Sequence, residues 1–479
     1  MSLRPSPSPP GVLAVVGKPL AVLYHSLRQR PLLWYGFLVP LSVTVFEKSE
    51  GLVTTVPPIV PITAGFLLLA VFGGGIGLAK RTWRASPTEL SLYALVCVIE
   101  SLLVLHHRNA DGWEFVAGRV TFLMVVLATI ANGRDSGAVG NALWGITGGV
   151  AVISLLTIMQ VLRVILFTSS WQGPESRLFG FLQMPVVRTL GIPMTYNRFG
   201  VMAAAALATV MVPGVGRGSI TQRSAVRAAL FFVSGAAVLV SQTRGVYLTM
   251  LWAFGLCLLL ALGRQRRFGW LSSPGGAWLA AAAFAMVLVL GNLLFTSVAP
   301  SWVIDLGYEQ SVLNVSRRVE LNALGWAAFR DEPLLGIGHG TLPSLRPGIT
   351  NIHNHFWEHI VSTGLAGGIP YVLFHLLILV GALRLLGSDR SGERAVAIVL
   401  VVSISATYVA YQFFMGFFTA EFAMVSGLVL LLRREERYPS AATGQQPSPS
   451  RDEGAQRLIA HASSPACCPR GTGEGLDCG

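Results

Sequence analysis

Long apolar segments alternate with short polar segments along most of the chain. A helix needs roughly 20 apolar residues to cross a hydrocarbon core of about 30 Å, and a crossing segment must be helical because lipid cannot pair its backbone groups. On this criterion the pattern predicts about twelve transmembrane helices, some of them short. They are expected over Leu32–Phe46, Val56–Ala79, Leu90–Leu105, Phe115–Ala131, Ala142–Phe167, Gly200–Val215, Ala225–Ser241, Gly245–Leu262, Ala277–Val298, Gly364–Leu386, Ala395–Phe418 and Phe422–Leu432. The expected fold is therefore all-α, in a polytopic integral membrane protein.

Basic residues are concentrated in alternate short connections between the predicted helices. Those connections hold Lys80, Arg81, Arg84, Arg217, Arg223, Arg227, Arg264, Arg266, Arg267, Arg384, Arg390, Arg394, Arg433, Arg434 and Arg437. The opposite short connections are nearly free of cations, with Lys48 and Arg108. Because cytoplasmic loops are enriched in lysine and arginine, both termini are expected in the cytoplasm, with the protein in the inner membrane. The two long connections, residues 168–199 and 299–363, are then expected on the periplasmic side.

The chain divides into three regions by composition. Residues 1–30 are expected to be a cytoplasmic segment without a cleavable signal peptide, because their apolar stretch is too short for one. Residues 31–433 hold the predicted transmembrane domain. Residues 434–479 are rich in Pro, Ser, Gly and Gln, which predicts a disordered cytoplasmic tail.

Overall composition agrees with lipid as the main solvent. The chain is 53% hydrophobic and only 12% charged, with a mean hydropathy of +0.61, whereas a soluble domain carries roughly 25% charged residues. A net charge of +12 would suggest nucleic-acid binding in a soluble protein. Here the basic cytoplasmic loops account for it, so no nucleic-acid partner is expected.

Conspicuous polar residues gather in the outward connections and at the outer ends of the helices. They are Arg177, Arg188, Asn197, Arg244, Arg317, Arg318, His339, His353, Asn354, His355, Glu358 and His359, with Glu100, Arg119 and Arg163 inside predicted spans. Ionisable groups at membrane depth are costly, so each is a functional candidate. Arginine presents a planar fork that matches phosphate oxygens two at a time, and several converging arginines predict a bound anion such as a lipid diphosphate. Any one arginine alone can equally meet lipid headgroups. Arg244 is the most informative, since it lies in a hairpin almost without a loop and breaks the charge pattern.

Two patterns in the second long connection suggest other chemistry. Gly336, Gly338 and Gly340 superficially suggest a nucleotide-binding loop, but no strand precedes them and no Lys-Ser/Thr pair follows. The segment from His355 to His359 matches the inverted zinc-protease pattern His-x-x-Glu-His. Such a short pattern arises easily by chance, and these histidines can instead form hydrogen bonds at a helix start. No metal or cofactor is therefore expected.

Three stretches of the second half carry a recognisable order of motifs. They are Arg188–Gly191 followed by Asn197; Ser241–Gly245, which includes Arg244; and a last stretch made of Arg318–Leu321, Asp331–Gly338, His353–Asn354 and Gly364–Gly367. In the last stretch the His-Asn pair stands eleven residues before Gly-Leu-x-Gly, with Pro-Leu-Leu-Gly-x-Gly upstream. Together these motifs resemble the O-antigen ligase and polymerase family of bacterial surface-polysaccharide assembly.

This resemblance implies a GT-C-like helical fold and a metal-independent glycosyltransferase. The donor would be an undecaprenyl-diphosphate-linked glycan, transferred on the periplasmic side in O-antigen or exopolysaccharide biosynthesis. His353 would be the general base that deprotonates the acceptor hydroxyl, and a single displacement would invert the anomeric centre. The residues expected to hold the diphosphate or glycan are Arg188, Arg244, Arg318, Asn197, Asn354 and His355. His355 is also the rival candidate for the base.

Two questions stay open from the sequence. A ligase would use a lipid A-core acceptor and a polymerase a lipid-linked repeat unit, while chain-length regulators and flippases are further candidate partners. A lipid-linked glycan flippase or other transporter is the alternative function, since about twelve spans fit it equally well. Against that alternative, the chain shows no repeated halves and has one very long outer connection, residues 299–363.

Overall fold

The described part of the computed structural model is almost entirely helical. It comprises residues 25–44, 59–72, 87–108, 112–133, 136–161, 170–172, 176–178, 182–184, 187–189, 196–215, 224–241, 244–263, 265–305, 309–341, 352, 354–387, 391–412 and 420–437. The expected disordered tail, from residue 438 onward, and most of the segment 1–30 lie outside these ranges.

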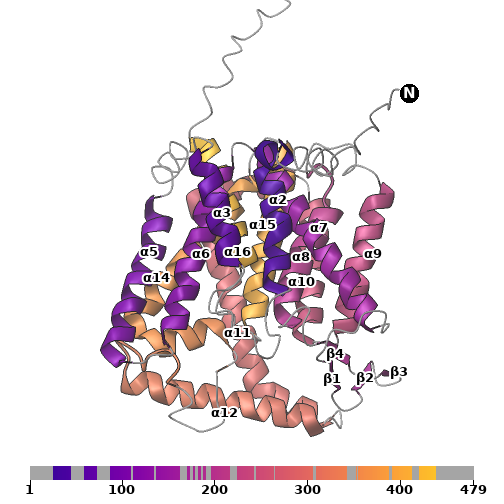
Figure 1. The fold of residues 1–479 in the computed structure, drawn as a ribbon. Coiled ribbons are helices and arrows are strands. Elements are labelled where there is room, and N and C mark those ends of the chain that lie inside the picture. Colours follow the sequence, from indigo (N-terminus) through magenta and orange to yellow (C-terminus); the bar gives the residue numbers. More distant parts are fainter. Residues whose placement is uncertain are drawn as a thin grey trace, which may run out of the picture. The chain divides into compact units, whose positions relative to one another are not determined.

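Each predicted apolar segment coincides with a helix. The helices are α2 (Pro31–Thr44), α3 (Ile59–Phe72), α5 (Pro87–His107), α6 (Gly112–Asn132), α7 (Ser136–Val161), α8 (Tyr196–Met211), α9 (Ser224–Ser241), α10 (Arg244–Leu262), α11 (Pro274–Asp305), α12 (Glu309–Asp331), α14 (His355–Leu385), α15 (Ser391–Tyr411) and α16 (Ala420–Arg437), with the short 3₁₀ helix η1 (Gln265–Ser272). In Figure 1 most of them run roughly side by side in one bundle. The all-helical prediction for the membrane domain is confirmed in this respect.

Within the described residues, five helical segments are long and apolar enough to cross a membrane by length and composition. These are Pro87–His107, Gly112–Asn132, Gly137–Leu156, His355–Leu385 and Glu393–Tyr411; shorter apolar helices accompany them. Large apolar side chains such as Phe72, Leu251 and Leu279 point outward and are mostly exposed, as contact with lipid requires. The chain is thus an integral membrane protein, whereas the count of twelve crossings stays a prediction.

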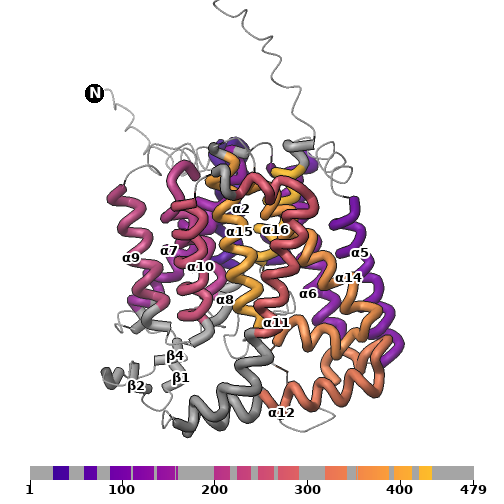
Figure 2. The backbone as a smooth tube through the Cα atoms, turned by 180° about the vertical axis from the view of Figure 1, so that it is seen from behind, coloured from indigo at the N-terminus to yellow at the C-terminus, as the bar shows by residue number. Residues whose placement is uncertain are grey.

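The two long connections are more ordered than a loop prediction allows. In the first, β1 (Ser170–Gln172) pairs antiparallel with β4 (Val187–Thr189), and β2 (Ser176–Leu178) pairs with β3 (Leu182–Met184). The fold class remains all-α, and in this small region short extended segments satisfy each other's backbone groups. In the second, α12 crosses the end of the bundle at which α5 ends and α14 begins, and it contacts α11 and α14 (Figures 1 and 2).

Helix α14 is broken near its amino-terminal end, where the backbones of Gly336 and Gly364 approach each other closely. Gly364 has φ 61° and ψ −163°, a conformation that side chains disfavour. Here residues 333–338 are joined to the kink by four main-chain hydrogen bonds. The amides of Ile337 and Gly338 donate to the carbonyls of Val361 and Ser362, and the amides of Leu365 and Ala366 donate to the carbonyls of Pro333 and Leu334. A Cβ on Gly364 would stand 2.3 Å from the Leu334 carbonyl oxygen, and one on Gly336 would stand 2.4 Å from the Gly364 nitrogen. The kink divides α14 into a short amino-terminal part, residues 355–363, and a longer carboxy-terminal part, which are its outer and inner parts in the predicted topology.

Candidate functional site

The residues predicted from sequence for the base and the diphosphate are only partly described. His353 lies outside the described residues. Arg188 is in β4, Asn197 is in the first turn of α8, Arg244 begins α10 and Arg318 is in α12, but their side chains lie outside the described part. Their convergence on a diphosphate stays a prediction.

The chain on either side of residue 353 is held by buried polar contacts. Asn354 is the N-cap of α14, and its Oδ1 accepts a hydrogen bond of 3.0 Å from the Trp357 amide, a role for which asparagine is favoured. Its Nδ2 donates to Gln412 Oε1, just beyond α15, over 3.0 Å. The backbone amide of Ile352 donates to the buried Glu358 carboxylate over 3.1 Å. The predicted base thus stands between two anchored neighbours.

A buried ion pair lies beneath the same helix start. Arg119 of α6 donates from Nε to Oε1 of Glu100 of α5 over 3.0 Å, and the two residues are 4% and 0% exposed. A buried pair of this kind is strongly destabilised when one partner is lost, because the other charge is then left without compensation. The sequence marked both residues individually as costly intramembrane charges, and the structure brings them together.

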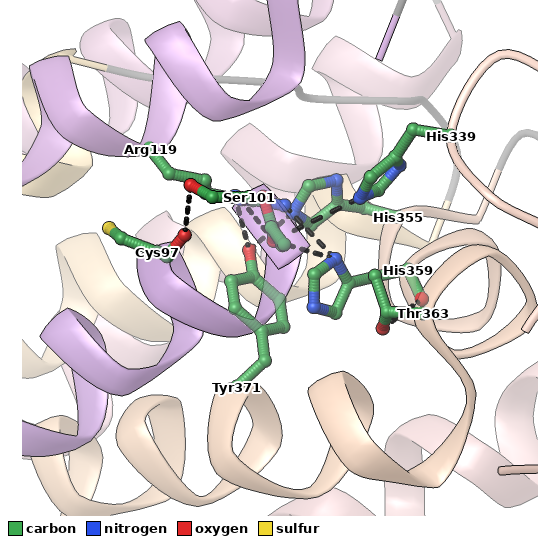
Figure 3. Close-up of polar contacts among 9 residues, drawn as sticks. Cys97, Ser101, Arg119, His339, His355, His359, Thr363 and Tyr371 are labelled. Carbon is green, nitrogen blue, oxygen red and sulfur yellow. Dashed lines mark hydrogen bonds and ion pairs between the residues drawn. The ribbon is translucent and has the colours of Figure 1, made fainter. Parts of the chain in front are cut away.

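The same guanidinium reaches two residues of α14 (Figure 3). Its NH1 donates to the Tyr371 hydroxyl over 3.2 Å, and its NH2 lies 3.2 Å from His359 Nδ1. The Tyr371 hydroxyl in turn lies 2.5 Å from His355 Nε2. We call Glu100, Arg119, His355, His359 and Tyr371 the buried polar cluster. It ties α5 and α6 to both the outer and the inner part of α14.

His339 closes this cluster from the connection between α12 and α14. Its ring stacks on Phe115 with centroids 4.3 Å apart, and its Nε2 lies 3.9 Å from Glu100 Oε1. Burial, followed by the nearby Arg119 charge, lowers the pKa of His339 from 6.5 to about 3. His339 is therefore neutral at physiological pH.

A metal site was the alternative use of these histidines. Among the described residues, Glu100, His339 and His359 bring ligand atoms within 4.8 Å of one another. However, Arg119 already contacts Glu100 Oε1 and His359 Nδ1, so the cation among these groups is a guanidinium. His355, the other histidine of the zinc-protease pattern, is directed to Tyr371 instead. In the described geometry the two histidines of the zinc-protease pattern therefore contact different partners, His355 the Tyr371 hydroxyl and His359 the Arg119 guanidinium.

An apolar cavity of about 560 Å³ lies on another side of α14. It lies between α11, α12, α14 and α15 and is mostly apolar, with amide groups at Asn322, Asn354 and Gln412. Its wall consists of Phe284, Ala285, Leu288, Val289, Asn322, Trp326, Asn354, Phe356, Trp357, Ile360, Val372, His375, Leu376, Leu379, Tyr408 and Gln412. The indole rings of Trp326 and Trp357 stack with centroids 5.6 Å apart. A cavity lined in this way suits a hydrocarbon chain that carries a polar group at one end.

Several of these residues were missed by sequence reasoning. Tyr371 and Gln412 carry no motif, and nothing in their local sequence marks them. One signal was available, since opposite charges on neighbouring apolar helices, as at Glu100 and Arg119, are more stable paired than apart.

The described structure is thus a membrane-embedded helical bundle with an apolar cavity beside a histidine-bearing helix start. Residues 229–372 match the family model described as O-Antigen ligase, which confirms the family prediction for this part of the chain. The matched range runs from α9 to the inner part of α14 and includes Arg244, Arg318 and His353. No curated protein matches the chain significantly. The family points to a membrane enzyme of polysaccharide assembly with glycosyltransferase-like activity.

Proposed function

We propose that the protein transfers a glycan from undecaprenyl diphosphate to an acceptor hydroxyl on the periplasmic face of the inner membrane, in O-antigen or exopolysaccharide biosynthesis. The observation that carries this proposal is the apolar cavity, whose wall includes Asn354, the residue next to His353. A polyprenyl chain in the cavity would bring its diphosphate and first sugar to the start of α14. The GT-C-like fold, the twelve crossings and the cytoplasmic termini belong to the same proposal.

The reaction needs no cofactor energy, because the sugar already carries a good leaving group. The acceptor oxygen forms a bond to the anomeric carbon, and the bond from that carbon to the phosphate oxygen breaks. His353 takes the acceptor proton, a role for which an imidazole with a reference pKa near 6.5 is suited. Arg188, Arg244 and Arg318 stabilise the charge on the departing undecaprenyl diphosphate. Asn197 and Asn354 contact the glycan or its diphosphate.

A reconstituted transfer assay tests the proposal. Wild-type protein in lipid vesicles, supplied with lipid-linked glycan and a lipid acceptor, should produce glycosylated acceptor that is visible by gel mobility and mass spectrometry. His353→Ala should lower the rate by roughly 10²- to 10⁴-fold while the protein stays in the membrane. His106→Ala is the matched control, because His106 is exposed at the outer end of α5. A fully active His353→Ala variant would refute the assignment of the base.

The same vesicles separate transfer from transport. Movement of lipid-linked glycan across the bilayer without acceptor, together with absence of any glycosylated product, would favour the flippase alternative. Gene deletion then distinguishes the two transferase types. Loss of long chains, with a single repeat still on lipid A-core, indicates a polymerase, whereas long chains left on undecaprenyl diphosphate indicate a ligase.

A further inference from the structure

The buried polar cluster fixes where the hydrogens lie on Tyr371 and His355. A guanidinium has only donors, so the Tyr371 oxygen must accept the hydrogen bond from Arg119 NH1. The one hydrogen of the Tyr371 hydroxyl is then free to point at His355 Nε2, 2.5 Å away. In the reverse arrangement that buried hydroxyl hydrogen would have no other acceptor among the described residues, which is costly away from water.

His355 therefore accepts at Nε2, and a neutral imidazole that accepts at one nitrogen carries its hydrogen on the other. The hydrogen of His355 lies on Nδ1. By the same reasoning, His359 accepts from Arg119 at Nδ1 and carries its hydrogen on Nε2. Arg119 thus sets opposite tautomers on two histidines one turn apart, on His359 directly and on His355 through Tyr371. This assignment follows from the hydrogen-bond partners.

We infer that Arg119 and Tyr371 are positioning residues that hold His355 as a hydrogen-bond donor and exclude it as the base. His355 is the first residue of α14 and lies two positions after His353. A base must offer an unprotonated nitrogen to the acceptor hydroxyl. The unprotonated nitrogen of His355 is Nε2, and it already accepts the hydrogen bond from the Tyr371 hydroxyl. The inference rests on the proposed function for the role of His353, while the tautomer itself does not depend on it.

An amide side chain at position 355 distinguishes a hydrogen-bond donor from a general base. The side-chain NH₂ of asparagine occupies nearly the position of histidine Nδ1, so His355→Asn keeps a donor there but cannot accept a proton as a base. We expect His355→Asn to retain transfer within about tenfold of wild type, and His355→Ala to lose roughly 10- to 100-fold in kcat. A His355→Asn variant as inactive as His353→Ala would overturn the inference.

Removal of the Tyr371 hydroxyl tests the positioning role. Tyr371→Phe should lower kcat by roughly tenfold with little change in KM, because the His355 ring loses its fixed orientation. Tyr93→Phe is the matched control, since Tyr93 is equally buried in α5 and its hydroxyl has no partner among the described residues. Equal effects of the two substitutions, or an effect on KM alone, would contradict a positioning role.

A spectroscopic readout keeps the inference testable even if transfer is not the activity. In ¹⁵N-histidine-labelled protein in lipid, the His355 signals should show a protonated Nδ1 and an unprotonated Nε2. Tyr371→Phe should abolish this single pattern and give a mixture of tautomers. A protonated Nε2 on His355 in the wild-type protein would overturn the inference, whatever the protein transfers. A wild-type protein that has the expected spectrum but no transfer activity would count only against the proposed function.

Discussion

Two faces of the outer part of α14 differ completely in chemistry. His355 and His359, one turn apart, face the buried polar cluster. Phe356 and Ile360, also one turn apart and each a single position further on, line the apolar cavity. Because side chains four residues apart share one side of a helix, a shift of one position separates the two environments. One face anchors the helix to α5 and α6, and the other lines the cavity in which we propose that the lipid chain binds.

This division has a consequence for experiment. Changes on the anchoring face should act on the stability of the fold and on kcat, and changes on the cavity face mainly on substrate binding. Three substitutions, in order of decreasing effect, test whether the two faces are separable.

Loss of the central cation should have the largest effect. Arg119→Met leaves Glu100 buried and without its ion-pair partner, which should lower the free energy of unfolding by about 3–5 kcal/mol. The double variant Arg119→Met/Glu100→Met should recover most of that loss, because neither charge then remains in the interior. Thermal unfolding in detergent micelles measures both. A double variant that is less stable than Arg119→Met would show that the pair is not what stabilises this face.

The second largest effect should be on how strongly acid destabilises the folded protein. The pKa of His339 is about 3 in the folded protein and 6.5 in the unfolded chain, where it is unperturbed. As pH falls below about 6.5, the unfolded chain binds a proton that folded His339 refuses, so stability falls steadily toward pH 3. His339→Gln should weaken this acid-induced loss and leave the pH dependence above pH 7 unchanged. Unfolding midpoints between pH 4 and pH 8 measure the difference, and identical slopes for both proteins would contradict it.

The cavity face should give the smallest effect, and an effect of a different kind. Leu376→Trp places a larger side chain in the cavity and should raise KM for the long-chain lipid donor by about tenfold, the equivalent of roughly two buried methylene groups. Neither kcat nor the unfolding midpoint should change much. The matched control Leu251→Trp, at an exposed position on α10, should leave KM unchanged. If Leu376→Trp lowers stability as strongly as Arg119→Met, the two faces are not separable.

Apolar periodicity predicted the helices well but misjudged where α14 begins. The apolar run starts at Gly364, whereas the helix starts at His355. His355, Glu358 and His359 interrupt the run, so the sequence favoured a loop. In the structure each of these side chains has a buried polar partner supplied by a distant part of the chain or by the capping turn. Such tertiary compensation cannot be deduced from local pattern.

The site was predictable as a region rather than as a geometry. The motif around His353 and Asn354 predicts where the chemistry lies, which stays a prediction, and Glu100 and Arg119 stood out as charges inside apolar helices. Their pairing, and the part of Tyr371 in it, depend on which helices become neighbours. That information resides in the packing of α5, α6 and α14, not in any single segment.

The interlocked glycines at Gly336 and Gly364 imply a particular freedom for the rest of the molecule. Four hydrogen bonds between main-chain atoms join the two segments, so replacement of a nearby side chain leaves these bonds in place. Wall residues such as Phe356 and Ile360 can therefore differ in size while the main-chain hydrogen bonds beside the helix start stay in place. A change in the lining of the cavity then requires no change in the backbone that holds it.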